Sequence, residues 1–127
     1  MQVEVVSPER ILFSGEADMV VCRTTDGDIA FMANHAPFIG ALGIGAVKIY
    51  ANGSVIEQAA VHGGFVEVSN NRVTILSDVA ELASQIDLRR AEEALARNEA
   101  RLTREQDAEV EAAVRRATVR VELGKAA

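Results

Sequence analysis

Few residues of this chain have the types and the spacing that metal binding needs. The two histidines, His35 and His62, are far apart in the sequence with no third candidate ligand beside them, and Cys22 is the chain's single cysteine. Protein zinc sites gather three or four His, Cys or carboxylate ligands. The sequence therefore predicts no metal site, and Cys22, within an apolar run, is interpreted as a buried structural thiol.

The glycine pair Gly63-Gly64 follows His62 and is the only stretch that suggests a phosphate-binding loop. Such loops open into a helix and carry a Lys-Ser/Thr pair, and neither follows here. A bulge or a close crossing of strands before Phe65 is the favoured interpretation. Because no serine or cysteine stands in a nucleophile motif and the acids of the first eighty residues are scattered, no catalytic residues are predicted.

The arginines near the C-terminal end are the groups best suited to binding. Residues 81–127 hold ten acids and nine bases, eight of which are arginine. Acids at 105–111 precede Arg115, Arg116 and Arg120, an order that suits a helix dipole and requires no function. The alternative is that Arg90, Arg97 and the later arginines bind phosphates or an acidic protein surface, as forked guanidinium groups do well.

The elements that carry these residues change in character between residues 78 and 91. Before this segment, apolar residues come in short runs that end at turn residues, and after it they fall three and four positions apart among charges. The first pattern is typical of strands and the second of helices. The sequence predicts an α+β fold: an N-terminal antiparallel β-sandwich, residues 1–82, followed by a C-terminal antiparallel two-helix hairpin, residues 83–127.

Turn signals divide the first half into short strands. Asn52-Gly53 and Ser69-Asn-Asn71 favour tight β-hairpins because these residues tolerate positive φ. The glycine-spaced run at 40–45 predicts a bend between two sheets. Residues 11–24 predict either two strands or one strand interrupted at Ser14-Gly15. Turns about every ten residues are typical of a sandwich.

Two apolar stripes define the helices of the second half. The first stripe is Leu88, Ala91, Leu95, Asn98 and Leu102, and the second is Val110, Val114, Ala117 and Val121. Asp87 or Ser84 can cap the first helix, Thr103 with Gln106 is interpreted as a capping box for the second, and Gly124 is expected to end it. Both stripes are thin, so we expect helices that dock weakly and remain helical when they undock.

The composition excludes several classes of protein. The apolar fraction is 49%, the charged fraction is 25% and the net charge is −6, which suits a globular protein and argues against a nucleic-acid footprint. No apolar run approaches the roughly 20 residues that span a bilayer, and the first residues lack a signal-peptide pattern. We expect a protein of the cytosol or peripheral to something within it.

Six segments in order resemble the epsilon subunit of the F-type ATP synthase, over nearly the whole chain. They are Val6-Ser-Pro-Glu-Arg-Ile-Leu-Phe-Ser-Gly15, Thr25-Asp-Gly-Asp-Ile29, His35-Ala-Pro37, Gly63-Gly-Phe-Val-Glu-Val68, Val73-Thr-Ile-Leu76 and Ile86-Asp-Leu-Arg-Arg-Ala91. Each is weak alone, but together they match in register. The resemblance implies the same sandwich and helical hairpin. One departure is that Ala30, Phe31, Met32 and Ala33 stand where the family has a glycine and then a proline before the histidine.

The resemblance also implies a role and partners. Such subunits are non-catalytic parts of the central rotor of the proton-translocating ATP synthase, attached to the gamma subunit and resting on the c-subunit ring. By resemblance, Asp28 and His35 face that ring. The expected location is the cytoplasmic face of the bacterial plasma membrane, reached through the complex alone.

Regulation is a further implication of the resemblance. The helical hairpin of such subunits can extend along gamma toward the alpha and beta subunits and hinder ATP hydrolysis, which would bring Arg115, Arg116 and Arg120 to an acidic segment of beta. No cofactor is required, but some members bind ATP as a regulatory ligand. The implied nucleotide-binding residues are Glu81, Ile86, Asp87, Arg90, Ala91 and Arg97.

Two functions of other classes remain as alternatives. One is an ATP-sensing regulatory module whose hairpin folds on nucleotide. The other is a free-standing enzyme on a β-sandwich, for which the sequence offers no catalytic constellation.

Overall fold

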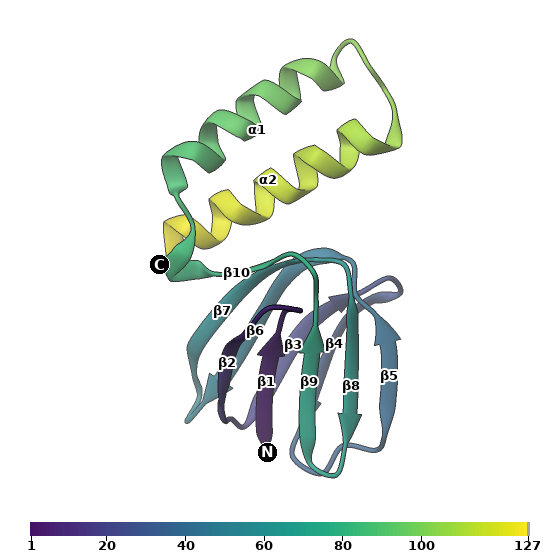
Figure 1. The fold of residues 1–127 in the computed structure, drawn as a ribbon, viewed down its shortest axis with the longest axis vertical. Helices are drawn as coiled ribbons and strands as arrows, with labels where there is room; N and C mark the ends of the chain where they lie inside the picture. Colours follow the sequence, from purple (N-terminus) through teal and green to yellow (C-terminus); the bar gives the residue numbers. More distant parts are fainter. Residues whose placement is uncertain (127) are drawn as a thin grey trace.

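Strands occupy the first two thirds of the chain and helices the last third, in a computed structural model that describes residues 1–126 (Figure 1). The strands are β1 Gln2–Val6, β2 Ile11–Glu16, β3 Met19–Thr24, β4 Gly27–Met32, β5 Phe38–Ala41, β6 Ile44–Ala51, β7 Ser54–His62, β8 Phe65–Ser69, β9 Arg72–Leu76 and β10 Ala80–Leu82. A 3₁₀ turn, η1 (Ala83–Gln85), leads to the helices α1 (Leu88–Leu102) and α2 (Ala108–Ala126). The predicted sandwich and helix pair are confirmed.

Two five-stranded sheets form the sandwich, with strand orders β2-β1-β9-β8-β5 and β10-β7-β6-β3-β4. Alternate residues of each strand point inward, as the pleat requires. The core is rich in β-branched side chains that are at most 1% exposed, among them Val3, Val5, Val66 and Ile75 from the first sheet and Val20, Val47, Ile49 and Val61 from the second. Cys22 is also fully buried, as predicted.

One pair of strands departs from the antiparallel pattern. β1 runs parallel to β9, with Val3 opposite Val73 and Val5 opposite Ile75. The other pairs between the strands are antiparallel. The sequence pattern missed this pairing because only a hairpin turn specifies direction locally, and about seventy residues separate β1 from β9.

The tight turns follow the sequence signals. Asn52, Asn70 and Asn71 have φ of +53°, +52° and +57°, as the predicted hairpins require. The glycine-spaced run carries the chain from β5 in the first sheet to β6 in the second, which confirms the predicted bend. At Gly64, with φ of +111°, an added Cβ would lie 2.0 Å from the carbonyl oxygen of Leu76. The glycine pair is therefore a close strand crossing, as interpreted.

The first strand boundary was misplaced. Residues 11–24 do form two strands, but Gly15 pairs with Val3 inside β2 and the break falls at Ala17-Asp18. The Ala17 amide donates to Met1 and the Asp18 amide donates to Tyr50, which belongs to the other sheet. The chain therefore leaves one sheet for the other at this point, and tertiary pairing rather than local glycine content sets the boundary.

The predicted boundaries of the second helix were wrong at both ends. Thr103 terminates α1, and its hydroxyl donates to the Ala100 carbonyl at 2.7 Å. α2 begins at Ala108, after Asp107 accepts a hydrogen bond from the Val110 amide at 2.9 Å. Asp87 caps α1 as predicted, accepting from the Arg90 amide. Asp107 rather than Thr103 caps α2 because it stands three residues before Val110, the first buried apolar residue of the helix, and so can accept from its amide.

Gly124 does not stop α2, which continues to Ala126. A Cβ at Gly124 would lie 3.2 Å from Leu88 Cδ1 and 3.3 Å from Ile86 Cγ2. The glycine therefore serves close packing against the start of α1 rather than helix termination.

The hairpin docks on the sandwich through α2, while α1 lies on the far side of α2 (Figure 1). Leu123 of α2, Ala60 of β7 and Ala83 of η1 form a small buried cluster, flanked by half-buried side chains of Ala46, Ile86 and Val119. This cluster is separate from the sandwich core. Across residues 1–126, neither helix combines the length and apolar character that a bilayer crossing needs.

Candidate nucleotide cleft between the sandwich and the hairpin

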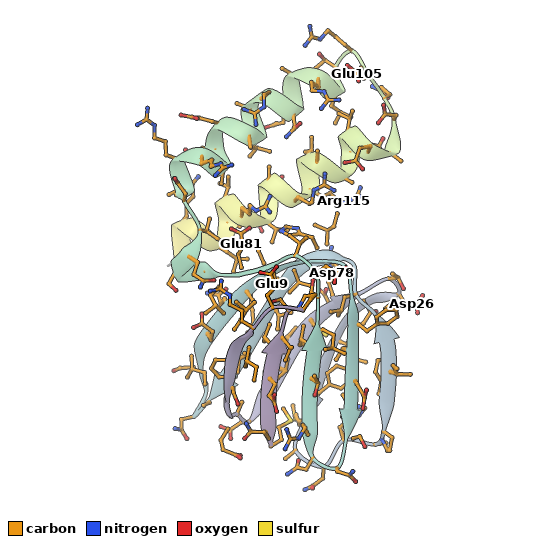
Figure 2. The ribbon with its side chains drawn as sticks, viewed as in Figure 1. Glu9, Asp26, Asp78, Glu81, Glu105 and Arg115 are labelled. Carbon is orange, nitrogen blue, oxygen red and sulfur yellow. The ribbon has the colours of Figure 1, made fainter. Side chains whose placement is uncertain are left out.

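A cleft of about 640 Å³ lies where the hairpin meets the end of the sandwich. Its volume is typical of small-molecule sites, which run from about 300 to 1,000 Å³. Glu9, Asp78 and Glu81 gather on the sandwich side of the cleft, below the helices (Figure 2). The cleft therefore includes residues from both parts of the molecule.

All six residues implied as nucleotide-binding line this one cleft. Glu81 comes from β10, Ile86 and Asp87 from the segment before α1, and Arg90, Ala91 and Arg97 from the first three turns of α1. The positions 87, 90, 91, 94 and 97 recur at helical spacing and so present one face of the helix to the cleft. The structure brings the six residues together; whether they hold a nucleotide stays a prediction.

Within residues 1–126, two carboxylates of the cleft are engaged by the protein, while some of its guanidinium groups have no carboxylate partner. Asp87 caps α1, and Glu81 Oε1 accepts a hydrogen bond from Arg120 Nε at 2.5 Å. Within residues 1–126, no carboxylate pairs with Arg90 or Arg97. Guanidinium groups that lack a protein partner are suited to phosphate oxygens.

Sequence reasoning missed four charged groups of the cleft: Arg120 from α2, Asp78 from the segment before β10, and Glu9 and Arg10 from the turn between β1 and β2. Arg120 was placed instead in a contact with another subunit. Its position here was foreseeable, because an antiparallel hairpin returns the end of α2 to the start of α1. The β1–β2 turn gave no such signal, since its approach to α1 is a tertiary contact between distant segments.

The two residues implied to face the c ring lie at opposite ends of β4. Asp28 is beside the β3–β4 turn, where Arg23 Nε donates to its carboxylate at 2.9 Å and holds its pKa below the ordinary value. His35 is in the turn beyond Met32, edge-on to the buried Phe31 at 4.9 Å between ring centroids. Because β4 is an edge strand, a partner lying along this edge would reach both residues.

Two of the three arginines implied to contact beta are engaged within the chain. Arg116 donates to Glu109 at 2.8 Å, and Arg120 is the partner of Glu81. Arg115 is exposed and lies on α2 (Figure 2). Arg116 and its partner Glu109 lie on the same helix, which supports the interpretation that this arginine stabilises α2 itself. Asp107, another of the acids at 105–111, also acts within α2, as its cap.

Two further features, neither of them part of the cleft, bear on other kinds of chemistry. Burial raises the pKa of the Cys22 thiol to about 11, which keeps it protonated and unreactive near neutral pH. Among residues 1–126, no three His, Cys, Asp or Glu side chains are grouped as a metal site would be.

Comparison with known proteins places the chain in a family. The model of the ATP synthase delta/epsilon chain β-sandwich domain matches residues 1–83. The ATP synthase epsilon chain of Symbiobacterium thermophilum is 46% identical over 127 residues, covering 95% of this chain and 90% of that one. That of Streptomyces avermitilis is 45% identical over 121 residues, covering 95% and 92%. The chain belongs to the ATP synthase epsilon chain family.

Epsilon chains are non-catalytic components of the central stalk, or rotor, of F-type ATP synthase, and this chain is one of them. Solved structures share the fold. A chain of the Euglena gracilis mitochondrial ATP synthase aligns with a TM-score of 0.75 at 21% identity, covering 98% of this chain and 78% of that one. A chain from the central stalk and c ring of the Tetrahymena thermophila enzyme aligns with a TM-score of 0.57 at 15% identity, covering 68% and 69%.

Proposed function

We propose that this epsilon chain fastens the gamma subunit to the c ring through its sandwich and restrains ATP hydrolysis through its helical hairpin. The hairpin would leave the sandwich, extend along gamma and reach the alpha and beta subunits. The chain would associate with the cytoplasmic face of a bacterial plasma membrane only through the complex. The observation that carries this proposal is that the hairpin docks outside the sandwich core, on a small apolar cluster of its own.

The energetics of that cluster favour a separable hairpin. Leu123 is its largest buried side chain, and full burial of a leucine stabilises by about 2 kcal/mol. The other members are alanines or half-buried side chains, which add less. Undocking would expose little apolar surface while the sandwich keeps its own core, and α1 and α2 would still pack together.

Arg120 couples docking to the proposed inhibitory contact. In the docked arrangement it pairs with Glu81, so its guanidinium is not available to an acidic segment of beta. Undocking would free Arg120 for such a surface, which a forked cation suits. The two positions of the hairpin would therefore compete for the same side chain.

Truncation tests this proposal. A chain that ends at Ser84 keeps every strand and loses both helices. We expect the truncated chain to co-purify with gamma and support coupled ATP synthesis, while the complex hydrolyses ATP faster than the complex with the full chain. Loss of gamma binding, or unchanged hydrolysis, would count against the proposal.

A second candidate function is ATP sensing at the cleft. It is favoured by the gathering of Arg90, Arg97 and Arg120 on one cleft of suitable volume. Bound nucleotide would bridge α1 and the sandwich end, and so would stabilise the docked hairpin by binding that state alone.

Calorimetric titration of the full chain with ATP tests this second function. We expect saturable binding that Arg90→Ala weakens at least tenfold, because about 1.4 kcal/mol of a charge-assisted contact is worth that factor. Arg89→Ala is the matched control, since Arg89 is exposed, pairs with Glu93 and does not line the cleft. Absence of saturable heat below millimolar ATP would remove ATP sensing.

A further inference from the structure

His62 ends β7 at the place where the sandwich meets the hairpin. The His62 amide donates to the carbonyl of Val79, just before β10, and His62 lies opposite Ile44 of β6 in the sheet. α2 packs on these two strands, β6 and β7. Both ring nitrogens are buried and have no hydrogen-bond partner among residues 1–126. A buried imidazole without hydrogen-bond partners lowers stability, so its position at the surface where the hairpin docks calls for an explanation.

The charged groups around the ring come from each element that packs near it. α2 contributes Arg116 and Arg120, whose charges act on the ring, and Arg115, which shares a cavity with it. β10 contributes Glu81, the segment before it Asp78, and β3 contributes Arg23. Cations predominate on the helix side. A proton on His62 would therefore meet both desolvation and like charge while the hairpin is docked.

We propose that His62 makes docking of the hairpin sensitive to pH, so that acidification releases the hairpin from the sandwich. The inference rests on the proposed function only in requiring that the hairpin can undock. A proton on the imidazole ring favours the undocked state because the guanidinium groups of Arg116 and Arg120 lie near the ring while α2 is docked and move away with α2 when it undocks.

The direction follows from the two protonation equilibria. Burial first, and then the positive charge of Arg120, lower the pKa of His62 from 6.5 to about 4 in the docked chain. In the undocked chain the ring is hydrated and its pKa returns toward 6.5. The docked state therefore binds fewer protons, so docking is strongest above pH 6.5 and weakens as the pH falls from 6.5 toward 4. Between pH 8 and pH 5 the ratio of docked to undocked chains should fall about thirtyfold.

Distances between paired spin labels on the full chain measure this ratio. Labels at Asp26→Cys on the sandwich and Glu105→Cys at the far end of the hairpin would report undocking, because both sites are exposed (Figure 2). The buried Cys22 can stay in place. The labels are placed in a Leu123→Ala variant, which lacks the largest side chain of the docking cluster. Docking is weaker in this variant, so that docked and undocked chains are both populated enough to be measured. We expect the undocked fraction to rise steeply from pH 8 to pH 5.

Two variants separate the outcomes. His62→Gln keeps a polar side chain that does not titrate, and should hold the ratio within about threefold over the same pH range, a loss of about tenfold in pH response. His35→Gln removes the other histidine and should retain the full response, because the neighbouring Asn34 bonds to Asn71 in the β8–β9 turn, at the end of the sandwich away from the helices (Figure 1). A response unchanged in His62→Gln would overturn the inference about His62 alone. No undocking at any pH in the Leu123→Ala background would overturn both the inference and the mobile hairpin.

Discussion

Gly64 joins strands at the end of the sandwich on which the hairpin docks. Its carbonyl accepts from the Leu42 amide at 2.9 Å, and its α-carbon faces the end of β9 so closely that a methyl group would overlap the Leu76 carbonyl. This crossing sets the end of the sandwich where His62 and the β9–β10 segment meet the hairpin.

We predict that Gly64→Ala lowers the free energy of unfolding by about 3 kcal/mol or more, because it combines a left-handed φ with a backbone clash. The matched control is Gly53→Ala, which has φ of +78° but nothing within 4 Å of the added Cβ, and should cost about 1 kcal/mol. Denaturant unfolding of both variants checks this. Equal losses would mean that the clash at Gly64 is relieved by small backbone shifts.

Residue-level prediction from the sequence succeeded where a local rule applied. Asn52, Asn70 and Asn71 take the positive φ that hairpin turns require, and Asp87 caps α1. It failed for Arg120, whose place in the cleft depends on how two helices return on each other. The candidate cleft was predicted as a set of residues through family resemblance, but its sandwich wall at Glu9 and Arg10 depends on tertiary contacts that no local pattern encodes.

At the scale of elements, the strand and helix types follow from periodicity, while their partners and boundaries do not. Hairpin turns fixed the pairings of β6 with β7 and β8 with β9. The parallel pairing of β1 with β9 joins distant segments, and nothing local specifies it. The start of α2 was misplaced because Thr103 and Asp107 are both residue types that cap helices, whereas in the structure the Thr103 hydroxyl donates to Ala100 and only Asp107 accepts from the first turn of α2.

The competition between these two caps can be tested directly. Asp107→Ala should destabilise the first turn of α2 by about 1 kcal/mol, because it removes the acceptor for the Val110 amide. Thr103→Ala, the control, removes a hydroxyl that only donates to the Ala100 carbonyl and should cost less than about 0.5 kcal/mol. Hydrogen exchange of the amides at residues 108–111 would report the difference. A greater loss of protection in Thr103→Ala than in Asp107→Ala would support the predicted capping box of Thr103 and Gln106 instead.

At the scale of the whole molecule, a sandwich with a complete core carries two helices on a separate small cluster. The cleft, the Glu81–Arg120 ion pair and His62 all lie along that contact. A ligand or proton that binds there more tightly in one position of the hairpin than in the other would change the balance between docked and undocked helices. The proposed function therefore requires that the position of the hairpin sets the rate of ATP hydrolysis.

A reversible lock on the hairpin tests that claim most directly. The side-chain ends of Glu81 and Arg120 meet at 2.5 Å, so a short cleavable thiol cross-linker can join Glu81→Cys to Arg120→Cys with the hairpin docked. The measurement is ATP hydrolysis by the assembled complex before cross-linking, after it and after cleavage of the linker. We predict that the lock raises hydrolysis to the rate seen with the chain ending at Ser84, and that cleavage restores the rate of the unlocked double variant, in which Arg115 and Arg116 remain to contact beta. A locked complex that stays as inhibited as the unlocked double variant would contradict it.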